Sequence, residues 1–285
     1  MSVTSTQGRP MPRALARAGA LAVLLSMAVA GSAAAHGGHS SSAATQVPAG
    51  GPPVKLRGCF LTATFIPRPA SILQPVFRRP LDLSQTFYGP DPLLGVWGFD
   101  CDGARVAGRR VGRVIASLVA VPVGLTSAGA AQLANNFAHS IIRIDTSSPV
   151  LARALRRAGL PGRLVRSARY RHSPRGRVPS SGRLVVPGGY EIAVSASDLD
   201  PTNPHDHLNR FEHRGRSGRI SSLSLSSQDA ADRFCFPASR SCSATVRAPR
   251  GSALARLLGG RSAPAVVGFD HEQLARIDLD LRRGR

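Results

Sequence analysis

The residues best suited to chemistry in this sequence are histidines and arginines in its second half. His205 and His207 are two residues apart, and His213 follows six residues later. On a strand, this i and i+2 spacing would place two imidazoles on one face, and a third could complete a zinc site of three histidines. The preceding segment 200–204, Asp-Pro-Thr-Asn-Pro, predicts a turn. We therefore expect these histidines in a solvated loop and no metal site.

His213 has a second interpretation, because two arginines stand beside it at 214 and 216. An imidazole and two guanidiniums that lead into a strand could line a barrel mouth and bind a carboxylate. Elsewhere in the chain, an imidazole and a carboxylate could serve acid–base chemistry, although no catalytic residue can be assigned. The candidate ligand-binding residues are His139, Arg143, Glu191, His213, Arg214 and Arg216.

Residues 146–190 form the most basic part of the chain. They contain no acid, and Arg143 precedes ten further arginines, at 153, 156, 157, 163, 166, 169, 171, 175, 177 and 183. Such a cluster predicts salt-dependent attraction of an anionic cell-wall polymer, although a merely solvated basic face would have the same composition. The chain has few aromatic residues and no zinc-finger or RNA-binding signature, so we expect no specific nucleic-acid partner.

The motifs of several enzyme classes are absent from the sequence. It contains no Gly-x-Ser-x-Gly elbow, no P-loop and no His-Glu-x-x-His pair. Hydrolase, nucleotide-binding and metalloprotease functions therefore lack support.

The N-terminal segment 1–35 has the order of a cleavable secretion signal. Three arginines precede an apolar stretch at 18–30, and a run of small residues follows at 31–35. Cleavage after Ala35 would remove three arginines and no acid, which lowers the net charge from +21 to +18. No later segment is apolar over the roughly 20 residues that a membrane span needs. We expect a secreted or extracytoplasmic protein with no transmembrane segment in the mature chain.

Residues 36–53 are small, polar and rich in proline and glycine, which predicts a flexible leader. His36 would be the first residue after cleavage and could chelate copper through its amine and imidazole. A flexible leader does not hold it against a second ligand, so we expect no cofactor. Residues 54–285 are long enough for a single β-rich domain.

Four cysteines, at 59, 101, 235 and 242, lie beyond the signal segment. An even number in an oxidising compartment predicts two disulfides, for which three pairings exist. The segment 235–242 is short and rich in turn-forming residues, so local closure favours Cys235 with Cys242. Cys59 and Cys101 then form the other pair. The alternative, a metal site, is not favoured because the cysteines lack zinc-site spacing.

Short apolar runs separated by proline, glycine, aspartate and asparagine predict a mainly β protein. The expected strands are 60–66, 93–100, 113–123, 139–144, 162–170, 183–196, 219–226 and 242–248. A capping serine before Pro149 predicts a helix at 149–158, and a second short helix is expected at 252–258. Many strands with few helices favour a barrel or a sandwich.

Four segments carry a resemblance to a known family. Gly-Val-Trp-Gly-Phe-Asp-Cys at 95–101 follows proline-rich loops, and at 142–161 a strand leads into a short helix that ends in Ala-Gly-Leu-Pro. The other two are Glu-His-Arg-Gly-Arg-Ser-Gly at 212–218 and the stretch 248–259. In this order, over 56–281, they resemble secreted proteins of the acetoacetate decarboxylase-like superfamily. The resemblance implies a strongly curved β-barrel around an internal cavity.

The resemblance does not extend to the family's chemistry. Acetoacetate decarboxylase forms a Schiff base through a lysine, and that step requires an amine. The segment in which the family carries this lysine reads Thr-Ser-Ser-Pro-Val-Leu-Ala at 146–152, and the only lysine of the chain is Lys55, beside the leader. Arginine cannot replace it, because a guanidinium stays protonated. We expect no Schiff-base decarboxylation.

These observations favour a secreted β-barrel that binds a small molecule, anionic or partly apolar. Two other hypotheses remain. One is a basic cell-envelope protein that binds anionic polymers, and the other is an enzyme of unknown reaction that uses histidine and glutamate as acid and base. A closed cavity would favour ligand binding, and a carboxylate or imidazole buried in it would favour an enzyme.

Overall fold

The described part of the chain forms two β-sheets connected by short helices and turns. The computed structural model describes residues 52–77, 83, 91–123, 138–173, 180–196, 205–230, 232–235, 242–265 and 267–283, of which 138, 180, 196, 205–209, 226–230, 232–235 and 267–276 are described by their backbone alone. All of them belong to one unit, residues 47–285. The expected signal segment and nearly all of the leader lie outside the described residues, so both stay predictions.

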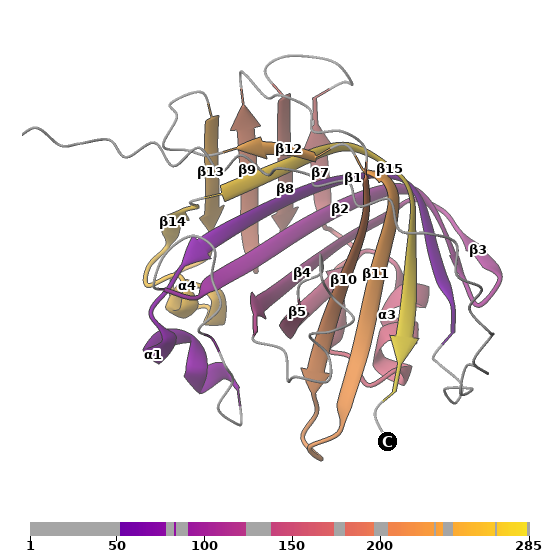
Figure 1. Cartoon of the computed structure of the whole chain (residues 1–285), viewed down its shortest axis with the longest axis horizontal. Helices are drawn as coiled ribbons and strands as arrows, with labels where there is room; N and C mark the ends of the chain where they lie inside the picture. The colour runs from indigo at the N-terminus through magenta and orange to yellow at the C-terminus, as the bar shows by residue number, and fades with distance from the viewer. Residues whose placement is uncertain are drawn as a thin grey trace, which may run out of the picture. The chain divides into compact units, whose positions relative to one another are not determined.

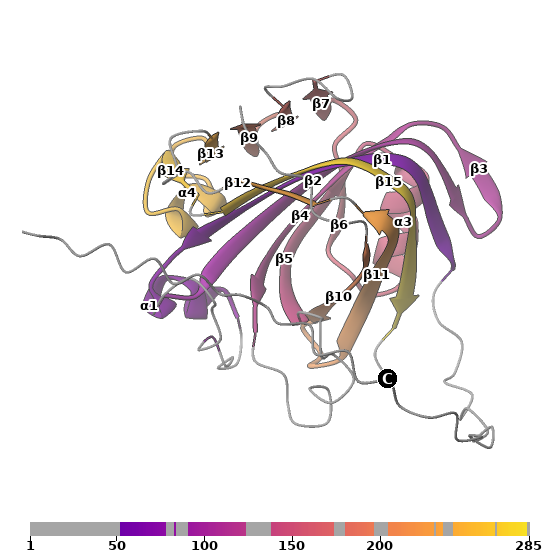
Figure 2. The same cartoon turned by 45° about the horizontal axis from the view of Figure 1, so that its top comes forward.

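Seven strands of the larger sheet close into a barrel (Figures 1 and 2). Their order is β1 (Val54–Pro67), β15 (Val267–Arg282), β11 (Ile220–Ala230), β10 (His205–Arg214), β5 (Ala138–Thr146), β4 (Val114–Pro122) and β2 (Leu93–Val106). The barrel is closed because β1 pairs with both β15 and β2. Only β10 and β5 pair in parallel among these seven strands. Three short strands extend the sheet: β3 (Arg109–Val111), β6 (Gly162–Leu164) and β12 (Asp232–Cys235).

A five-stranded sheet packs on the outside of the barrel. Its order is β14 (Ser262–Pro264), β13 (Cys242–Arg247), β9 (Tyr190–Ala196), β8 (Ser180–Val186) and β7 (Arg169–His172). These strands cross β1 and β2 steeply (Figure 1). Leu184 and Ile192 of this sheet are fully buried in one cluster with Val96 and Val119 of the barrel's outer face. The barrel wall therefore separates two cores.

Strand β2 shows how one strand serves both cores. All residues of 93–101 are buried, and successive side chains of a strand point to opposite faces. Phe99 belongs to the core inside the barrel, whereas Val96 belongs to the core between the sheets. Beyond this stretch Asp102 and Arg105 are exposed, because the second sheet no longer covers the outer face of the strand.

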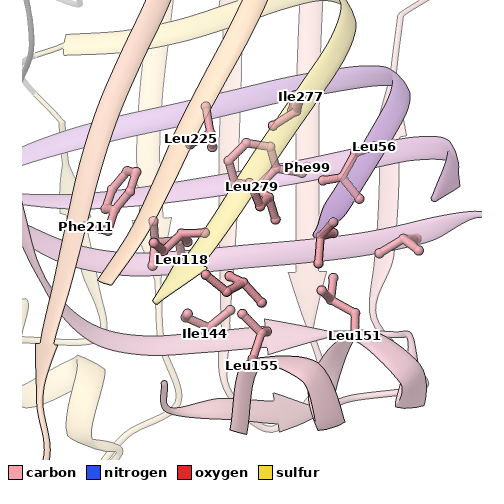
Figure 3. Packing of buried hydrophobic residues seen from close by; sticks show 14 of the residues in the cluster. Leu56, Phe99, Leu118, Ile144, Leu151, Leu155, Phe211, Leu225, Ile277 and Leu279 are labelled. Carbon is pink, nitrogen blue, oxygen red and sulfur yellow. The ribbon is translucent and has the colours of Figure 1, made fainter. Parts of the chain in front are cut away.

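Helix α3 (Pro149–Arg157) covers one end of the barrel core (Figure 3). It begins where the Oγ of Ser148 accepts a hydrogen bond from the backbone N–H of Leu151 at 3.2 Å, with proline in the first turn. Leu151 and Leu155 point from the helix into the barrel core. The helix is followed by Gly159, whose φ of +79° suits a residue without a side chain.

The remaining helices are short. Helix α1 (Ala70–Leu73) continues into the 3₁₀ turn η1 (Gln74–Val76), and α4 (Ala253–Leu257) begins at the capping residue Ser252. Leu254 and Leu257 of α4 are buried in the core between the two sheets. Among the described residues, no helix is long and apolar enough to cross a membrane.

The mainly β fold, the curved barrel and the two helices expected at 149–158 and 252–258 are confirmed. Two expected strands are divided. Residues 183–196 form the hairpin of β8 and β9, because Pro187 and two glycines turn the chain. Residues 162–170 form β6 and part of β7, which belong to different sheets. Strands β10 and β15 were not expected.

The disulfide between Cys59 and Cys101 is confirmed. The two residues face each other across β1 and β2, and both are completely buried. The side chain of Cys235 lies outside the described residues, so its pairing with Cys242 stays a prediction.

Replacing both Cys59 and Cys101 by alanine should lower the free energy of unfolding by about 4 kcal/mol, because the bond spans 42 residues of the unfolded chain. Urea denaturation followed by circular dichroism measures this change. Peptide mapping without reduction should recover each of the two expected pairs as one linked species. A free thiol at Cys59, or a double variant as stable as the wild type, would contradict the expectation.

Candidate functional site

His139 lies inside the barrel at the start of β5. Its ring stacks on Phe211 of β10 with centroids 4.8 Å apart, and Trp97 of β2 meets it edge-on at 5.1 Å. These three side chains are between 1% and 7% exposed. Phe65 of β1 contacts Trp97 edge-on at 5.2 Å. Four strands thus contribute one ring each to a patch of the inner wall, which we call the ring cluster.

The ring cluster lies toward the end of the barrel away from α3. His139 is near the first residue of β5, whereas α3 follows the last residue of that strand. Phe65 lies near the end of β1, where it pairs with Gly95. A side chain at Gly95 would collide with the indole of Trp97. Glycine at this position therefore makes room for the ring.

His213 lies on the same face of β10 as Phe211, two residues further along the strand, whereas the two arginines beside it lie apart from the ring cluster. The Nδ1 of His213 donates to the carbonyl oxygen of Ile141 at 3.3 Å. Arg214 and Arg216 are exposed at the turn between β10 and β11, where Arg214 donates to a backbone carbonyl of the same turn at 3.0 Å. The structure therefore brings His139 into a cluster and leaves these arginines on the surface.

Arg143 lies on the opposite face of the barrel wall, in the core between the sheets. Its Nε donates to Oδ2 of Asp145 at 2.6 Å, and its guanidinium lies over the ring of Tyr190 at 5.3 Å from the centroid. The hydroxyl of Tyr190 also donates to Asp145 Oδ2, at 3.2 Å, and lies 2.6 Å from the Oγ of Ser117. Asp145 is 1% exposed. The hydrogen bonds from Arg143 and Tyr190 together compensate the cost of removing this carboxylate from water.

Tyr190 is held as a neutral phenol in this cluster. Burial raises the pKa of Tyr190 above its usual range, and the charge of Asp145 raises it further. A hydroxyl that stays protonated can keep donating to Asp145. The cluster thus connects β4 and β5 of the barrel to β9 of the second sheet.

Glu191, the neighbour of Tyr190, points to the other face of β9. Its carboxylate accepts a hydrogen bond from Arg183 Nη2 at 2.9 Å, and its side chain is 22% exposed. Glu191 therefore shares a site neither with His139 nor with Arg143. An acid–base pair of Glu191 and His139 is not assembled.

The only lysine of the chain lies on the outside of the barrel. Lys55 is the second residue of β1 and is exposed, while its neighbours Val54 and Leu56 are buried. The resemblance places the family's lysine in the segment 146–152. Here the serine hydroxyls of that segment form hydrogen bonds with backbone N–H groups. Ser148 caps α3, and the Oγ of Ser147 accepts a hydrogen bond from the backbone N–H of Ile115 at 2.9 Å.

Metal-ligating groups do not gather in the described part of the chain. No three histidine, cysteine, aspartate or glutamate residues that could hold a metal ion lie together there. The loop expected for His205, His207 and His213 is wrong, because all three belong to strand β10. The side chains of His205 and His207 lie outside the described residues.

Sequence reasoning missed most members of the ring cluster and of the polar cluster around Asp145. Trp97 was noted only within the motif at 95–101, Phe211 lay outside every expected strand, and Tyr190 is 45 residues from Asp145 in the chain. One signal was present, since Arg143 and Asp145 are two residues apart at the end of the strand expected at 139–144, which the structure extends to Thr146, and residues at this spacing on a strand share a face.

Comparison with known proteins identifies the fold. Neither a protein-family model nor a curated protein sequence matches the chain. The enduracididine biosynthesis enzyme MppR complexed with pyruvate is 13% identical, with a TM-score of 0.51 over 85% of this chain and 92% of that one. MppR with bound HEPES is 11% identical, with a TM-score of 0.50 over 83% and 88%. Acetoacetate decarboxylase from Legionella pneumophila is 12% identical, with a TM-score of 0.48 over 85% and 92%. At these identities the likeness establishes the fold alone.

Tyr190→Phe should lower the free energy of unfolding by about 1–3 kcal/mol at neutral pH, because the buried Ser117 and Asp145 lose a hydrogen-bond partner. It should also reduce alkaline sensitivity. The raised pKa of Tyr190 contributes stability that is complete below the unfolded value of about 10 and lost as pH rises above it. Urea denaturation between pH 8 and pH 11 measures both effects. Ser117→Ala is the control, since it keeps the phenol and should retain the alkaline loss. Equal alkaline loss in Tyr190→Phe and wild type would contradict the assignment.

Proposed function

We propose that this protein, which has the fold of the acetoacetate decarboxylase-like superfamily, is an exported barrel that binds a small carboxylate without Schiff-base chemistry. The observation that carries the proposal is the ring cluster on the inner wall. It combines one imidazole with three apolar rings, contributed by four different strands.

The composition of the ring cluster indicates the class of ligand. Three aromatic rings offer flat apolar contacts, and the imidazole of His139 can donate an N–H to a carboxylate. The only buried acids of the described residues, Asp100 and Asp145, are bonded to Arg113 and Arg143. A small organic acid with an apolar part matches this environment.

The position of Lys55 supports binding without decarboxylation. An imine with a β-keto acid needs an unprotonated amine held beside the substrate in an apolar pocket. Lys55 is exposed on the outer face of β1, so the barrel wall stands between its amine and the ring cluster.

Export is supported by two independent features. The segment 1–35 has the charged, apolar and small-residue order of a signal peptide. The disulfide between Cys59 and Cys101 suits an oxidising compartment.

The single tryptophan of the chain makes ligand binding directly measurable. Trp97 belongs to the ring cluster, so its fluorescence should change saturably when a carboxylate binds there. Pyruvate is a suitable first probe because MppR has been solved with it, and phenylacetate adds an apolar ring. His139→Ala should weaken binding at least tenfold, as expected for loss of a charge-assisted hydrogen bond of about 1.5 kcal/mol or more.

His172→Ala is the matched control for this titration. His172 stacks on Phe60 at 3.5 Å, in the core between the sheets, so its loss should leave the affinity unchanged. Affinities are compared rather than amplitudes, because removal of His139 alters the surroundings of the indole. Absence of a saturable change with both carboxylates, or equal affinity in His139→Ala, would refute the proposed site.

Borohydride trapping tests the second half of the proposal. With acetoacetate or pyruvate, reduction should leave no covalent adduct on any peptide of residues 54–285, because Lys55 is solvated outside the barrel. Mass spectrometry of the digested protein measures this, and Lys55→Arg provides a control that keeps the charge. A stoichiometric adduct on Lys55, with carbon dioxide release that Lys55→Arg abolishes, would restore the family's activity.

A further inference from the structure

The outer face of the five-stranded sheet faces solvent, and none of its described side chains is fully buried. Leu184, Ile192 and Val246 point inward and are buried against the barrel, so the residues that alternate with them point away from it. Figure 2 shows β13, β9, β8 and β7 side by side above the barrel, and no described helix or strand lies over their other face.

Strand register arranges this outer face in three rows that run across the strands. The rows are Arg169, Val185, Glu191 and Arg247; Arg171, Arg183, Ala193 and Thr245; and Ser173, Ser181, Ser195 and Ser243. We call these twelve residues the arginine–serine face. With strands about 4.8 Å apart, each row spans roughly 15 Å.

The arginine–serine face carries a net charge of +3. It holds four arginines, and its one acid, Glu191, is bonded to Arg183. Arg169, Arg171 and Arg247 are exposed and form no ion pair with a described residue. The side chains between them are small, so the guanidinium groups remain accessible from solvent.

Positive charge continues beyond the edge of the sheet. A groove of about 530 Å³ is lined by Glu191, Arg247 and Arg261 among others. An adjoining hollow of about 340 Å³ shares Arg261 and adds Arg250 and Arg256. The surface is therefore elongated, which suits a chain of charges better than a single small anion.

We propose that the arginine–serine face binds an extended polyol-phosphate chain. Guanidinium groups bind phosphate oxygens in pairs, and the serine row offers hydroxyls that exchange hydrogen bonds with the free hydroxyls of a polyol. None of the twelve residues is aromatic, so the bases of a single-stranded nucleic acid would have nothing to stack on. This interaction goes beyond the proposed function, because the ring cluster lies inside the barrel.

Binding of the intact secreted chain to immobilised poly(glycerol phosphate) at 0.15 M salt tests the proposal. Arg169→Glu, Arg171→Glu and Arg247→Glu, combined, should weaken binding at least 30-fold, with Arg183 and Glu191 left unmutated. The control combines Arg153→Glu, Arg157→Glu and Arg166→Glu. These arginines are also exposed but lie on α3 and the turn after β6, so the same change in net charge should cost less than threefold. Thermal unfolding confirms that both variants fold.

A second pair of measurements separates hydroxyl recognition from charge. Ser181→Ala with Ser195→Ala should weaken binding to poly(glycerol phosphate) at least threefold and leave binding to inorganic polyphosphate, which has no hydroxyls, unchanged. Equal losses in the two arginine variants, or tighter binding of single-stranded DNA of equal charge, would overturn the proposal. His139→Ala should not alter polymer binding, so failure of the barrel proposal is distinguishable from failure of this one.

Discussion

Burial of both faces of β1, β2 and β4 is the constraint on which the structure depends. The first residues of β1 alternate between buried and exposed, as in a strand with one covered face, whereas Leu61–Thr64 are all buried. Strand β2 is buried on both faces at 93–101 and alternates beyond that stretch. A strand covered on both faces buries roughly twice the apolar area of a strand covered on one face, and its burial stabilises the fold correspondingly more. Trp97 lies on such a doubly packed segment and Phe65 directly follows one, so the ring cluster has a rigid wall behind it.

Close contact between the two sheets requires small and polar residues at chosen points. Gly182 lies against Thr62, whose hydroxyl is hydrogen-bonded to Tyr170, and a side chain at Gly182 would occupy the position of that hydroxyl. Ser117 and Tyr190 make a second polar connection in the same interface. Buried hydroxyls are costly when they lose their partners. These pairs therefore favour one placement of the second sheet on the barrel over a sliding apolar contact.

The sequence predicts the class of fold better than it predicts which residues form each strand and which distant residues contact one another. Helix α3 was found because its signals are local: a capping serine, a proline and a closing glycine. Strand β15 was missed although Ile277, Leu279 and Leu281 alternate with polar residues at its end. Strand β10 was missed because its polar residues read as a loop. The ring cluster and the Asp145–Tyr190 contact join residues far apart in the chain, and no spacing rule encodes such pairs.

The separation of faces explains how so basic a chain keeps an apolar interior. A net charge of +21 must be placed where water or an anion can compensate it. Among the described residues, the two buried carboxylates, Asp100 and Asp145, lie on the outer side of the barrel wall, and each is bonded to an arginine. The second sheet repeats this division, with apolar residues facing the barrel and arginines facing solvent. Because strand alternation places the charges of these described residues outside the barrel wall, the proposed small ligand and the proposed anionic polymer would bind on opposite sides of that wall.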